Sequence, residues 1–198
     1  MAAAGGAGVA EKVVWLTFDD GPEPGSTDRV LATLDRFGIK ATFFVIGQQV
    51  RRSPALLRET AAAGHRIGNH TETHPHLTEL DDAAVECEIV STGEAIGDLL
   101  GPDRLFRPPF GDRDRRVNRI IRKCGYRSLL WNVSTGDWNP VRQPAAWMKW
   151  GLRGVKRRAA PSVVLMHDNR PTTADHLPAF IGQLTEIEGL RFGAPSDL

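Results

Sequence analysis

The chain has 198 residues, of which 41% are hydrophobic and 25% charged, and its formal net charge is +1. These proportions are typical of a soluble globular protein and exclude a disordered or fibrous one. A nearly neutral charge gives no general attraction to nucleic acid, and no apolar run is long enough to cross a bilayer, so we expect neither a nucleic-acid partner nor stable membrane insertion.

The N-terminus carries no export signal in the sequence as written. Residues 1–12 are mostly small, and they lack the basic and then apolar regions of a signal peptide. We therefore predict a flexible segment over residues 1–12, one domain over residues 13–198 and a cytoplasmic location. Cys87 and Cys124 have no partner at metal-ligand spacing and are predicted to be half-buried residues without a function.

Apolar strand-like runs alternate with helical patterns along the chain. In chain order, the runs predict strands at residues 13–18, 41–46, 66–69, 105–106, 126–133, 162–166 and 190–192. Between them, helices are predicted at residues 26–37, 53–63, 81–100, 115–124, 143–155 and 173–188. This alternation predicts an α/β fold with a mainly parallel sheet, and the number of strands favours a closed or nearly closed barrel.

Short polar clusters follow five of these strands. The clusters are Asp19-Asp20-Gly21-Pro22, His70 with His74, residues 107–111, Asp137-Trp138 and His167-Asp168. In parallel α/β proteins the loops at the carboxyl ends of the strands converge, and active sites form there. Residues from most of the chain are therefore predicted to meet in one pocket.

Two histidines and two carboxylates in these clusters predict a hydrolytic metal site. His70 and His74 are four residues apart, so one turn of chain can direct both imidazoles at one ion. Asp19 and Asp20 leave their strand in different directions, so one can bind metal while the other faces substrate. Two imidazoles and one carboxylate leave coordination positions open, as hydrolysis requires. Taken alone, the two aspartates could instead end the strand in an Asx turn.

The five clusters resemble the five motifs of the polysaccharide deacetylases, the NodB-homology group of the carbohydrate esterases. Thr17-Phe18-Asp19-Asp20-Gly21-Pro22 resembles the first motif, His70 to His74 the second, Arg107-Pro108-Pro109-Phe110-Gly111 the third, Asp137-Trp138 the fourth and Leu165-Met166-His167 the fifth. One such motif is a modest indication, but all five in the family's order are specific. The resemblance implies a distorted (β/α) barrel of about seven parallel strands.

The resemblance also implies a role for each matched residue. Asp20, His70 and His74 would bind a divalent ion, expected to be Zn2+, although two nitrogens and one oxygen also suit Co2+ or Ni2+. Asp19 would act as the general base, and Arg107 would pair with it and keep it ionised.

The remaining matched residues would serve the leaving group and the substrate. His167 would protonate the departing amine, and Asp137 would orient this imidazole and favour its charged form. The backbone N–H of Phe110 would stabilise the oxyanion, and Trp138 would line the pocket for the acetyl methyl group. Pro109 is assigned to the substrate-binding set with them.

Two positions depart from the family's pattern. The fourth motif usually has an aspartate where Ser134 stands, and the third commonly has a tyrosine where Phe110 stands. The aspartate assigned to the acid histidine is retained, so catalysis is not obviously lost. Both changes indicate a specialised substrate surface.

These residues predict a metal-dependent N-deacetylase that releases acetate from an N-acetylated amino sugar of the N-acetylglucosamine type. The missing signal peptide favours a soluble glycosylated metabolite, such as a precursor of a glycopeptide antibiotic or of a nodulation factor. The alternatives are a chitin or peptidoglycan deacetylase and a carbohydrate-binding descendant without turnover. A glycosidase fits poorly, because its two carboxyl groups must be separated across the sugar. The sequence does not predict the oligomeric state.

Two basic stretches and an aromatic helix remain unexplained by the motifs. The stretches at residues 113–127 and 153–158 are predicted to be solvated faces, with a contact between Arg113 and an anionic substrate group as the alternative. Trp147 and Trp150 are predicted to be core, with an apolar shelf beside the pocket as the alternative.

Overall fold

The computed structural model describes residues 11–159 and 161–198. Of the segment predicted to be flexible, residues 1–10 lie outside the described residues, and the first strand begins at Lys12. The division into a terminal segment and one domain stays a prediction.

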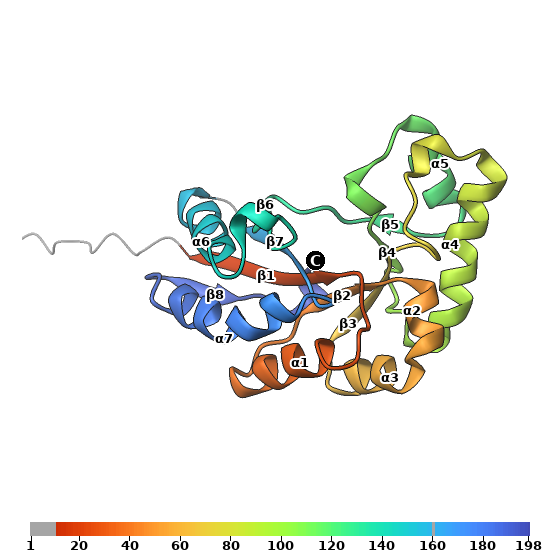
Figure 1. Cartoon of the computed structure of the whole chain (residues 1–198). Helices are drawn as coiled ribbons and strands as arrows, with labels where there is room; N and C mark the ends of the chain where they lie inside the picture. Colours follow the sequence, from red (N-terminus) through yellow and green to blue (C-terminus); the bar gives the residue numbers. More distant parts are fainter. Residues whose placement is uncertain (1–10, 160) are drawn as a thin grey trace, which may run out of the picture.

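The described residues form one curled sheet of eight parallel strands (Figure 1). The strands are β1 (Lys12–Asp19), β2 (Thr42–Val45), β3 (Arg66–Asn69), β4 (Leu105–Phe106), β5 (Arg127–Ser128), β6 (Val133–Ser134), β7 (Ser162–His167) and β8 (Leu190–Phe192). Seven of them follow the order β5-β4-β3-β2-β1-β7-β6, and β8 pairs with the first residues of β1. The predicted α/β fold with a parallel, barrel-like sheet is confirmed.

Helices pack around this sheet (Figure 1). They are α1 (Thr27–Arg36), α2 (Gly47–Arg52), α3 (Pro54–Ala62), α4 (Asp82–Ile96), α5 (Arg115–Lys123), α6 (Trp147–Arg157) and α7 (Pro171–Thr185). Helices α4 and α5 lie at the end of the sheet formed by β4 and β5, whereas α6 lies at the opposite end beside β6. None of the helices in the described residues is long and apolar enough to cross a membrane.

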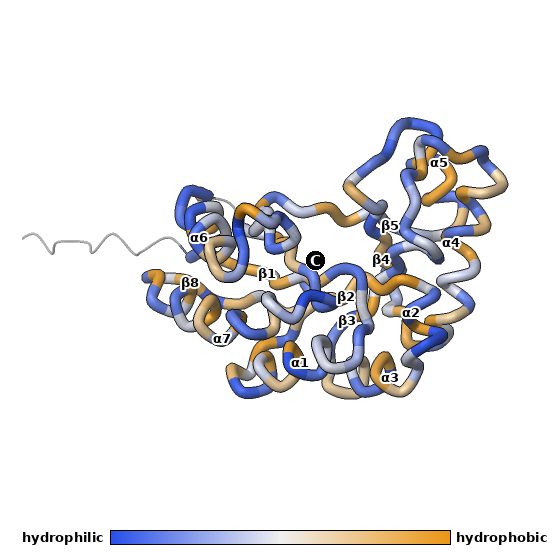
Figure 2. The backbone as a smooth tube through the Cα atoms, in the orientation of Figure 1, coloured by the Kyte–Doolittle hydropathy of each residue, from blue (hydrophilic) through white to orange (hydrophobic). Residues whose placement is uncertain are grey.

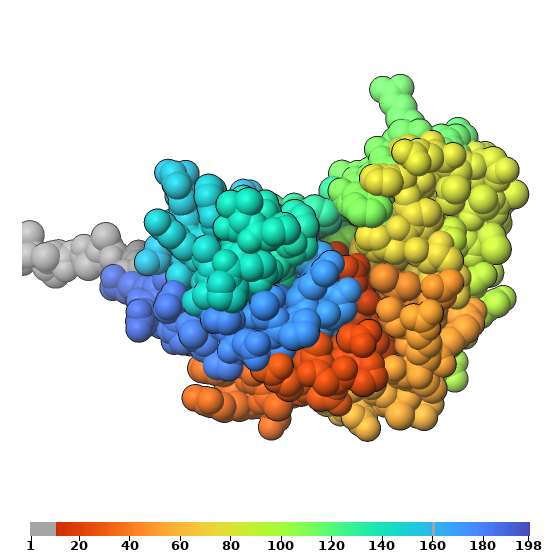
Figure 3. Space-filling model, in the orientation of Figure 1, coloured from red at the N-terminus to blue at the C-terminus, as the bar shows by residue number. Residues whose placement is uncertain are grey.

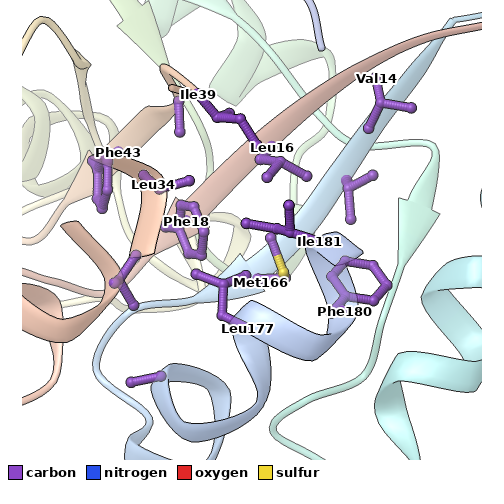
Figure 4. Close-up of a cluster of buried hydrophobic side chains, with 14 of the residues drawn as sticks. Val14, Leu16, Phe18, Leu34, Ile39, Phe43, Met166, Leu177, Phe180 and Ile181 are labelled. Carbon is purple, nitrogen blue, oxygen red and sulfur yellow. The ribbon is translucent and has the colours of Figure 1, made fainter. Parts of the chain in front are cut away.

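The main core lies between the central strands and helices α1 and α7. Alternate residues of β1 point into it, as do α7 residues three or four apart, which is the periodicity of each element. Figure 4 shows part of this cluster, including Val14, Leu16, Phe18, Met166, Leu177, Phe180 and Ile181. A second cluster joins α4 and α5 to β4, and along both helices hydrophobic and hydrophilic residues alternate (Figure 2). The two clusters fix the strands whose carboxyl ends carry the polar residues.

The apolar run at residues 126–133, predicted as one strand, forms two short strands instead. Strand β5 pairs with β4 at one edge of the sheet, and β6 pairs with β7 at the other edge. Residues 129–132 therefore cross between the two edges. The carbonyls of Leu129 and Leu130 accept hydrogen bonds from the Arg107 guanidinium rather than from a neighbouring strand. Strands β5 and β6 do not pair among the described residues, so the barrel stays open between these two edge strands.

Two helices and one cysteine differ from the sequence predictions. Helix α2 is not predicted, because its six residues contain no apolar period. Helix α6 begins at Trp147 instead of Gln143, after a 3-10 turn and Pro144, whose carbonyl accepts a hydrogen bond from the Trp147 indole. Trp147 is core as predicted, but Trp150 is 46% exposed. Cys87 is exposed rather than half-buried.

Candidate metal centre and active site

Strand register brings the polar clusters together. Asp19, the last residue of β1, pairs with His167, the last residue of β7. Asn69 at the end of β3 pairs with Phe106 of β4, so the residues that follow them, His70 and Arg107, also leave the sheet side by side. Neighbouring strands are about 4.8 Å apart, and side chains at their carboxyl ends therefore reach one another. Residues far apart in the sequence meet at this edge, as predicted.

Asp20, His70 and His74 converge on one point. The Nε2 atoms of the two histidines lie 3.5 Å and 3.3 Å from Asp20 Oδ1, and one ligand atom from each of the three residues lies within 4.8 Å of the others. Asp20 Oδ1 is buried and accepts no hydrogen bond from a described residue. A buried carboxylate oxygen without a donor is costly unless a ligand satisfies it. This donor set fits a divalent metal ion, which two imidazoles and one carboxylate would hold.

The surroundings of His70 favour its neutral imidazole. Its Nδ1–H donates to the backbone carbonyl of Arg107 at 2.6 Å, which leaves Nε2 as the free nitrogen facing Asp20. Burial lowers the pKa of His70 to about 3, against the opposing charge of Asp20. A neutral imidazole whose second nitrogen is held by a hydrogen bond is the usual form of a metal-binding histidine.

Asp168 packs closely against the loop that carries Asp20. Asp20 has a φ of 78°, so the chain turns sharply after β1. A Cβ atom on Gly21 would lie 2.0 Å from Asp168 Oδ2, so only glycine fits between the loop and this carboxylate. Asp168 Oδ2 also accepts a hydrogen bond from Thr27 Oγ1 at 2.6 Å, and burial raises the Asp168 pKa to about 7. The motif glycine is thus required by packing.

Asp19 is buried against the guanidinium of Arg107. Arg107 Nη1 donates to Asp19 Oδ1 at 2.7 Å and to Thr17 Oγ1 at 2.8 Å, and the Arg107 side chain is fully buried. Asp19 Oδ2 remains directed toward the metal-binding group, 3.7 Å from His70 Nε2. Burial raises the pKa of Asp19, and the charge of Arg107 opposes that shift. One oxygen is therefore anchored and the other faces the site.

His167 and Asp137 form a second pair, in which Asp137 is buried and His167 is partly exposed to the pocket. His167 Nδ1–H donates to Asp137 Oδ1 at 2.9 Å, which leaves Nε2 for the pocket. Asp137 Oδ2 accepts hydrogen bonds from the His167 backbone N–H at 2.8 Å and from Thr173 Oγ1 at 2.7 Å. Burial alone would lower the pKa of His167, but the hydrogen bond and charge of Asp137 raise it to about 9. His167 is therefore protonated at neutral pH.

These groups surround one open pocket of about 260 Å³. Figure 3 shows the surface hollowed between the green and the teal parts of the chain, and lining residues come from both parts. The lining residues are Asp19, Asp20, His70, His74, Phe110, Trp131, Trp138, Leu165, His167 and Arg170. Arg107 and Asp137 are buried behind this surface. The predicted residues are brought together, and their individual roles stay predictions.

Three lining residues were not assigned to the site from the sequence. Leu165 lies in the fifth motif, so its position two residues before His167 was a usable signal. Trp131 belongs to the segment that crosses between the sheet edges, and Arg170 directly precedes α7. Neither of these two positions has a local pattern that points to a pocket.

The rim of the pocket contains exposed aromatic rings. Phe110 is 57% exposed, and its ring stacks on His76 with a centroid distance of 4.0 Å and meets His74 edge to face. Trp138, 46% exposed, meets His167 edge to face. Pro109 is buried and is not among the lining residues, so its contact with substrate stays a prediction.

Ser134, where the family's pattern usually has an aspartate, lies outside the pocket. Its side chain borders a separate groove beside Trp150 and Arg153, and its buried Oγ has no hydrogen-bond partner among the described residues. Arg142 donates to the neighbouring carbonyl of Thr135 at 2.9 Å. The His167–Asp137 pair makes its hydrogen bonds without an aspartate at this position.

Comparisons with known proteins agree with this geometry. A peptidoglycan-N-acetylglucosamine deacetylase of Bacillus cereus is 32% identical over 195 residues, covering 95% of this chain and 88% of that protein. A chitooligosaccharide deacetylase of Rhizobium leguminosarum bv. trifolii is 36% identical over 169 residues, covering 83% and 75%. A family 4 carbohydrate esterase from Streptomyces lividans, solved in complex with acetate, has a TM-score of 0.81 and 35% identity, covering 93% of both chains.

The family described as polysaccharide deacetylase matches residues 6–129, which is more than half of the chain. The matched range contains the three polar clusters that supply the metal-binding group, the buried aspartate and its arginine. The chain belongs to the polysaccharide deacetylase family.

Proposed function

We propose that this protein hydrolyses the acetamide of an N-acetylated amino sugar of the N-acetylglucosamine type. The observation that carries the proposal is the pocket itself. A buried Asp19 beside the Asp20–His70–His74 group faces a protonated His167 on the neighbouring strand end. A carboxylate and a cationic acid beside one metal-binding group suit amide hydrolysis.

The surroundings of Asp19 suit the role of general base. Arg107 holds one of its oxygens at 2.7 Å, so the carboxylate cannot rotate freely, and the other oxygen is available to accept a proton from water. Burial raises the pKa of Asp19 and so strengthens its basicity, while the charge of Arg107 opposes that shift and favours the ionised form. The pair therefore combines orientation with a usable proton affinity.

Asp20, His70 and His74 would hold the metal ion, for which Zn2+ is our proposal and Co2+ or Ni2+ are alternatives. When bound, such an ion supplies Lewis acidity, which acidifies water and polarises a carbonyl oxygen. These three residues would hold the ion beside Asp19, whose Oδ2 lies 3.7 Å from His70 Nε2, so that Asp19 would accept a proton close to the ion-binding residues.

The raised pKa and the orientation of His167 suit the role of general acid. An amine is a poor leaving group until it is protonated, and His167 carries a proton at neutral pH because its pKa is raised to about 9. Asp137 holds Nδ1, so Nε2 is the atom that donates the proton to the departing amine. The backbone N–H of Phe110 is proposed to stabilise the oxyanion.

Trp138 and Leu165 line the pocket beside His167 and are proposed to receive the acetyl methyl group. The exposed rings of Phe110 and Trp138 can pack against sugar faces, where apolar C–H groups meet aromatic surfaces. The related proteins are deacetylases of peptidoglycan N-acetylglucosamine and of chitooligosaccharides. By analogy, we propose an oligosaccharide or glycan strand containing N-acetylglucosamine as the substrate. The soluble glycosylated metabolite expected from the sequence enters the test as a separate substrate, and the cytoplasmic location stays a prediction that cell fractionation checks.

A binding protein without turnover is disfavoured by the same pocket. Binding alone requires neither a carboxylate held by a buried arginine nor a histidine held in its charged form. A glycosidase is disfavoured because Asp19 and Asp20 are adjacent in the chain and both lie beside the histidine pair.

The test is acetate release by protein loaded with Zn2+, Co2+ or Ni2+, with a chelator-treated control. The substrates are chitooligosaccharides, a peptidoglycan fragment and an N-acetylglucosaminylated glycopeptide. We expect chelator-sensitive release of acetate with no new reducing ends. Reducing sugar without acetate would replace the proposal with a glycosidase, and tight binding without either product would replace it with a binding protein.

A further inference from the structure

Helix α6 presents an unpaired cationic face. Lys149, Arg153, Lys156 and Arg157 are exposed, and none of them forms an ion pair with a described residue. The helix contains no acidic residue. Because the formal charge of the whole chain is only +1, the rest of the chain is net acidic. The positive charge of this face is therefore not balanced by acidic residues of its own helix.

Exposed apolar side chains lie among these cations. Trp150 is 46% exposed, and the guanidinium of Arg142 lies 4.3 Å from the centre of its ring. Val141, next to Arg142 in the chain, is 89% exposed. We define the α6 face as Lys149, Trp150, Arg153, Lys156 and Arg157, with Val141 and Arg142 beside it. An exposed tryptophan framed by cations is typical of surfaces that meet the bilayer interface.

Two grooves run along the α6 face. One, of about 620 Å³, is lined by Met148 and Leu152 and bordered by Lys149, Arg153 and Lys156. The other, of about 460 Å³, contains Trp150 and is bordered by Arg153 and Arg157. Each groove thus combines apolar lining with cations at its border.

Helix α5 is also basic, but part of its charge is paired with acidic residues of a neighbouring helix. Arg116 and Lys123 of α5 form ion pairs with Asp82 and Glu86 of α4, and the large hydrophobic residues of α5 are buried. Exposed cations also occur here, at Arg115, Arg119 and Arg122, but they lie beside an acidic helix. Helix α5 therefore differs from α6 in that part of its charge is paired with an acidic helix and in that it exposes no tryptophan.

We propose that the α6 face binds the surface of an anionic phospholipid bilayer. The four cations match the negative headgroups, and Trp150 and Val141 can enter the interfacial region. A soluble polyanion would satisfy the charges but would leave both apolar side chains exposed to water. Attachment is peripheral, because it uses one face of a surface helix. The proposal does not depend on the deacetylase reaction.

The experiment compares vesicle binding by the whole protein and two charge-matched variants. The first variant is Lys149→Gln/Arg153→Gln/Lys156→Gln/Arg157→Gln, and the control is Arg113→Gln/Arg115→Gln/Arg119→Gln/Arg122→Gln. Vesicles contain phosphatidylcholine alone or with roughly a third phosphatidylglycerol. Each cation near an anionic surface changes the partition coefficient roughly fivefold. We expect the first variant to lose binding to anionic vesicles by at least about a hundredfold, and the control to retain it.

Trp150→Ser provides an independent readout. In the whole protein, lipids brominated near the headgroup should quench part of the tryptophan fluorescence, and this part should disappear in Trp150→Ser. Thermal unfolding of all variants checks that they remain folded. Equal loss in both charge variants, equal binding to neutral vesicles, or no binding to anionic vesicles overturns the proposal. Binding to long-chain polyphosphate without binding to vesicles also overturns it, in favour of a soluble polyanion.

Discussion

The two sides of the pocket differ in how their polar atoms are satisfied. On the metal-binding side, Asp20 Oδ1 and the Nε2 atoms of His70 and His74 face one another, and Asp20 Oδ1 accepts no hydrogen bond from a described residue. On the acid side, Asp137 accepts hydrogen bonds from His167 and Thr173 on both of its oxygens. The first side is incomplete without a ligand, whereas the protein alone completes the second.

This difference has a physical consequence. A buried polar atom without a partner costs free energy, so the metal-binding side gains stability when an ion binds. The acid side should keep its arrangement with or without the ion. Mutations on the two sides are therefore expected to separate metal content from proton transfer.

The largest effect is expected from His70→Ala. Removing one of three ligands should abolish both metal binding and acetate release, since the remaining two donors cannot hold a hydrolytic ion. Metal analysis after dialysis and an acetate assay measure the two effects. The control is His176→Ala, because His176 contacts the Thr172 carbonyl on α7. Normal metal content in His70→Ala would remove this residue from the ligand set.

The next largest effect is expected from Asp19→Asn. The substitution keeps the shape but removes the base, so kcat should fall by roughly 10²–10⁴-fold while metal content stays normal. Thermal unfolding should also shift downward, because Arg107 is left as a buried charge without its carboxylate. Full activity in this variant would contradict the assignment of Asp19 as base.

A smaller loss of activity, on the order of 10²-fold in kcat, is expected from Asp137→Asn. The amide retains the shape and can still accept a hydrogen bond from Thr173, but it no longer favours the charged form of His167. Metal content should equal that of the wild-type protein. A simultaneous loss of metal would show that the two sides are not separable.

The smallest effect is expected in the pH dependence of the free energy of unfolding of the metal-free protein. His167 has a pKa of about 9 in the folded protein, against 6.5 for an ordinary histidine. Between these values the folded state holds a proton that the unfolded state has released, so the free energy of unfolding falls as pH rises. The expected loss is about 3 kcal/mol, measured by denaturant titration after chelation. Asp137→Asn should flatten this dependence, and an unchanged slope would contradict it.

The site was more predictable from sequence than the path of the chain around it. Asp19, Asp20, His70 and His74 follow strands whose patterns are clear, and parallel strands bring their carboxyl ends together. The break at residues 129–132 was not predictable, because an apolar run looks the same in a strand and in a crossing segment. Arg107, from a distant part of the chain, donates hydrogen bonds to the carbonyls of Leu129 and Leu130 and so keeps this segment out of a strand.

Trp131 and Arg170 were missed for the same reason. The curl of the sheet brings Trp131 to the pocket, and the position of α7 brings Arg170 there. A local sequence pattern predicts neither arrangement. Helix α2 was missed because its six residues contain no apolar period, and its first residue, Gly47, packs closely against a distant segment. A Cβ atom on Gly47 would lie 2.0 Å from Glu72 Oε2, a contact between distant segments.

The segment that joins the two sheet edges constrains how this enzyme can evolve. It supplies Trp131 to the pocket wall, so inserting or deleting residues there would be a direct route to accepting a wider or narrower substrate. The same segment holds Arg107, which in turn holds Asp19. A lineage that changes substrate width by this route would also disturb the position of Asp19. We therefore expect diversification to favour substitutions at exposed Phe110 and Trp138, which leave that linkage intact.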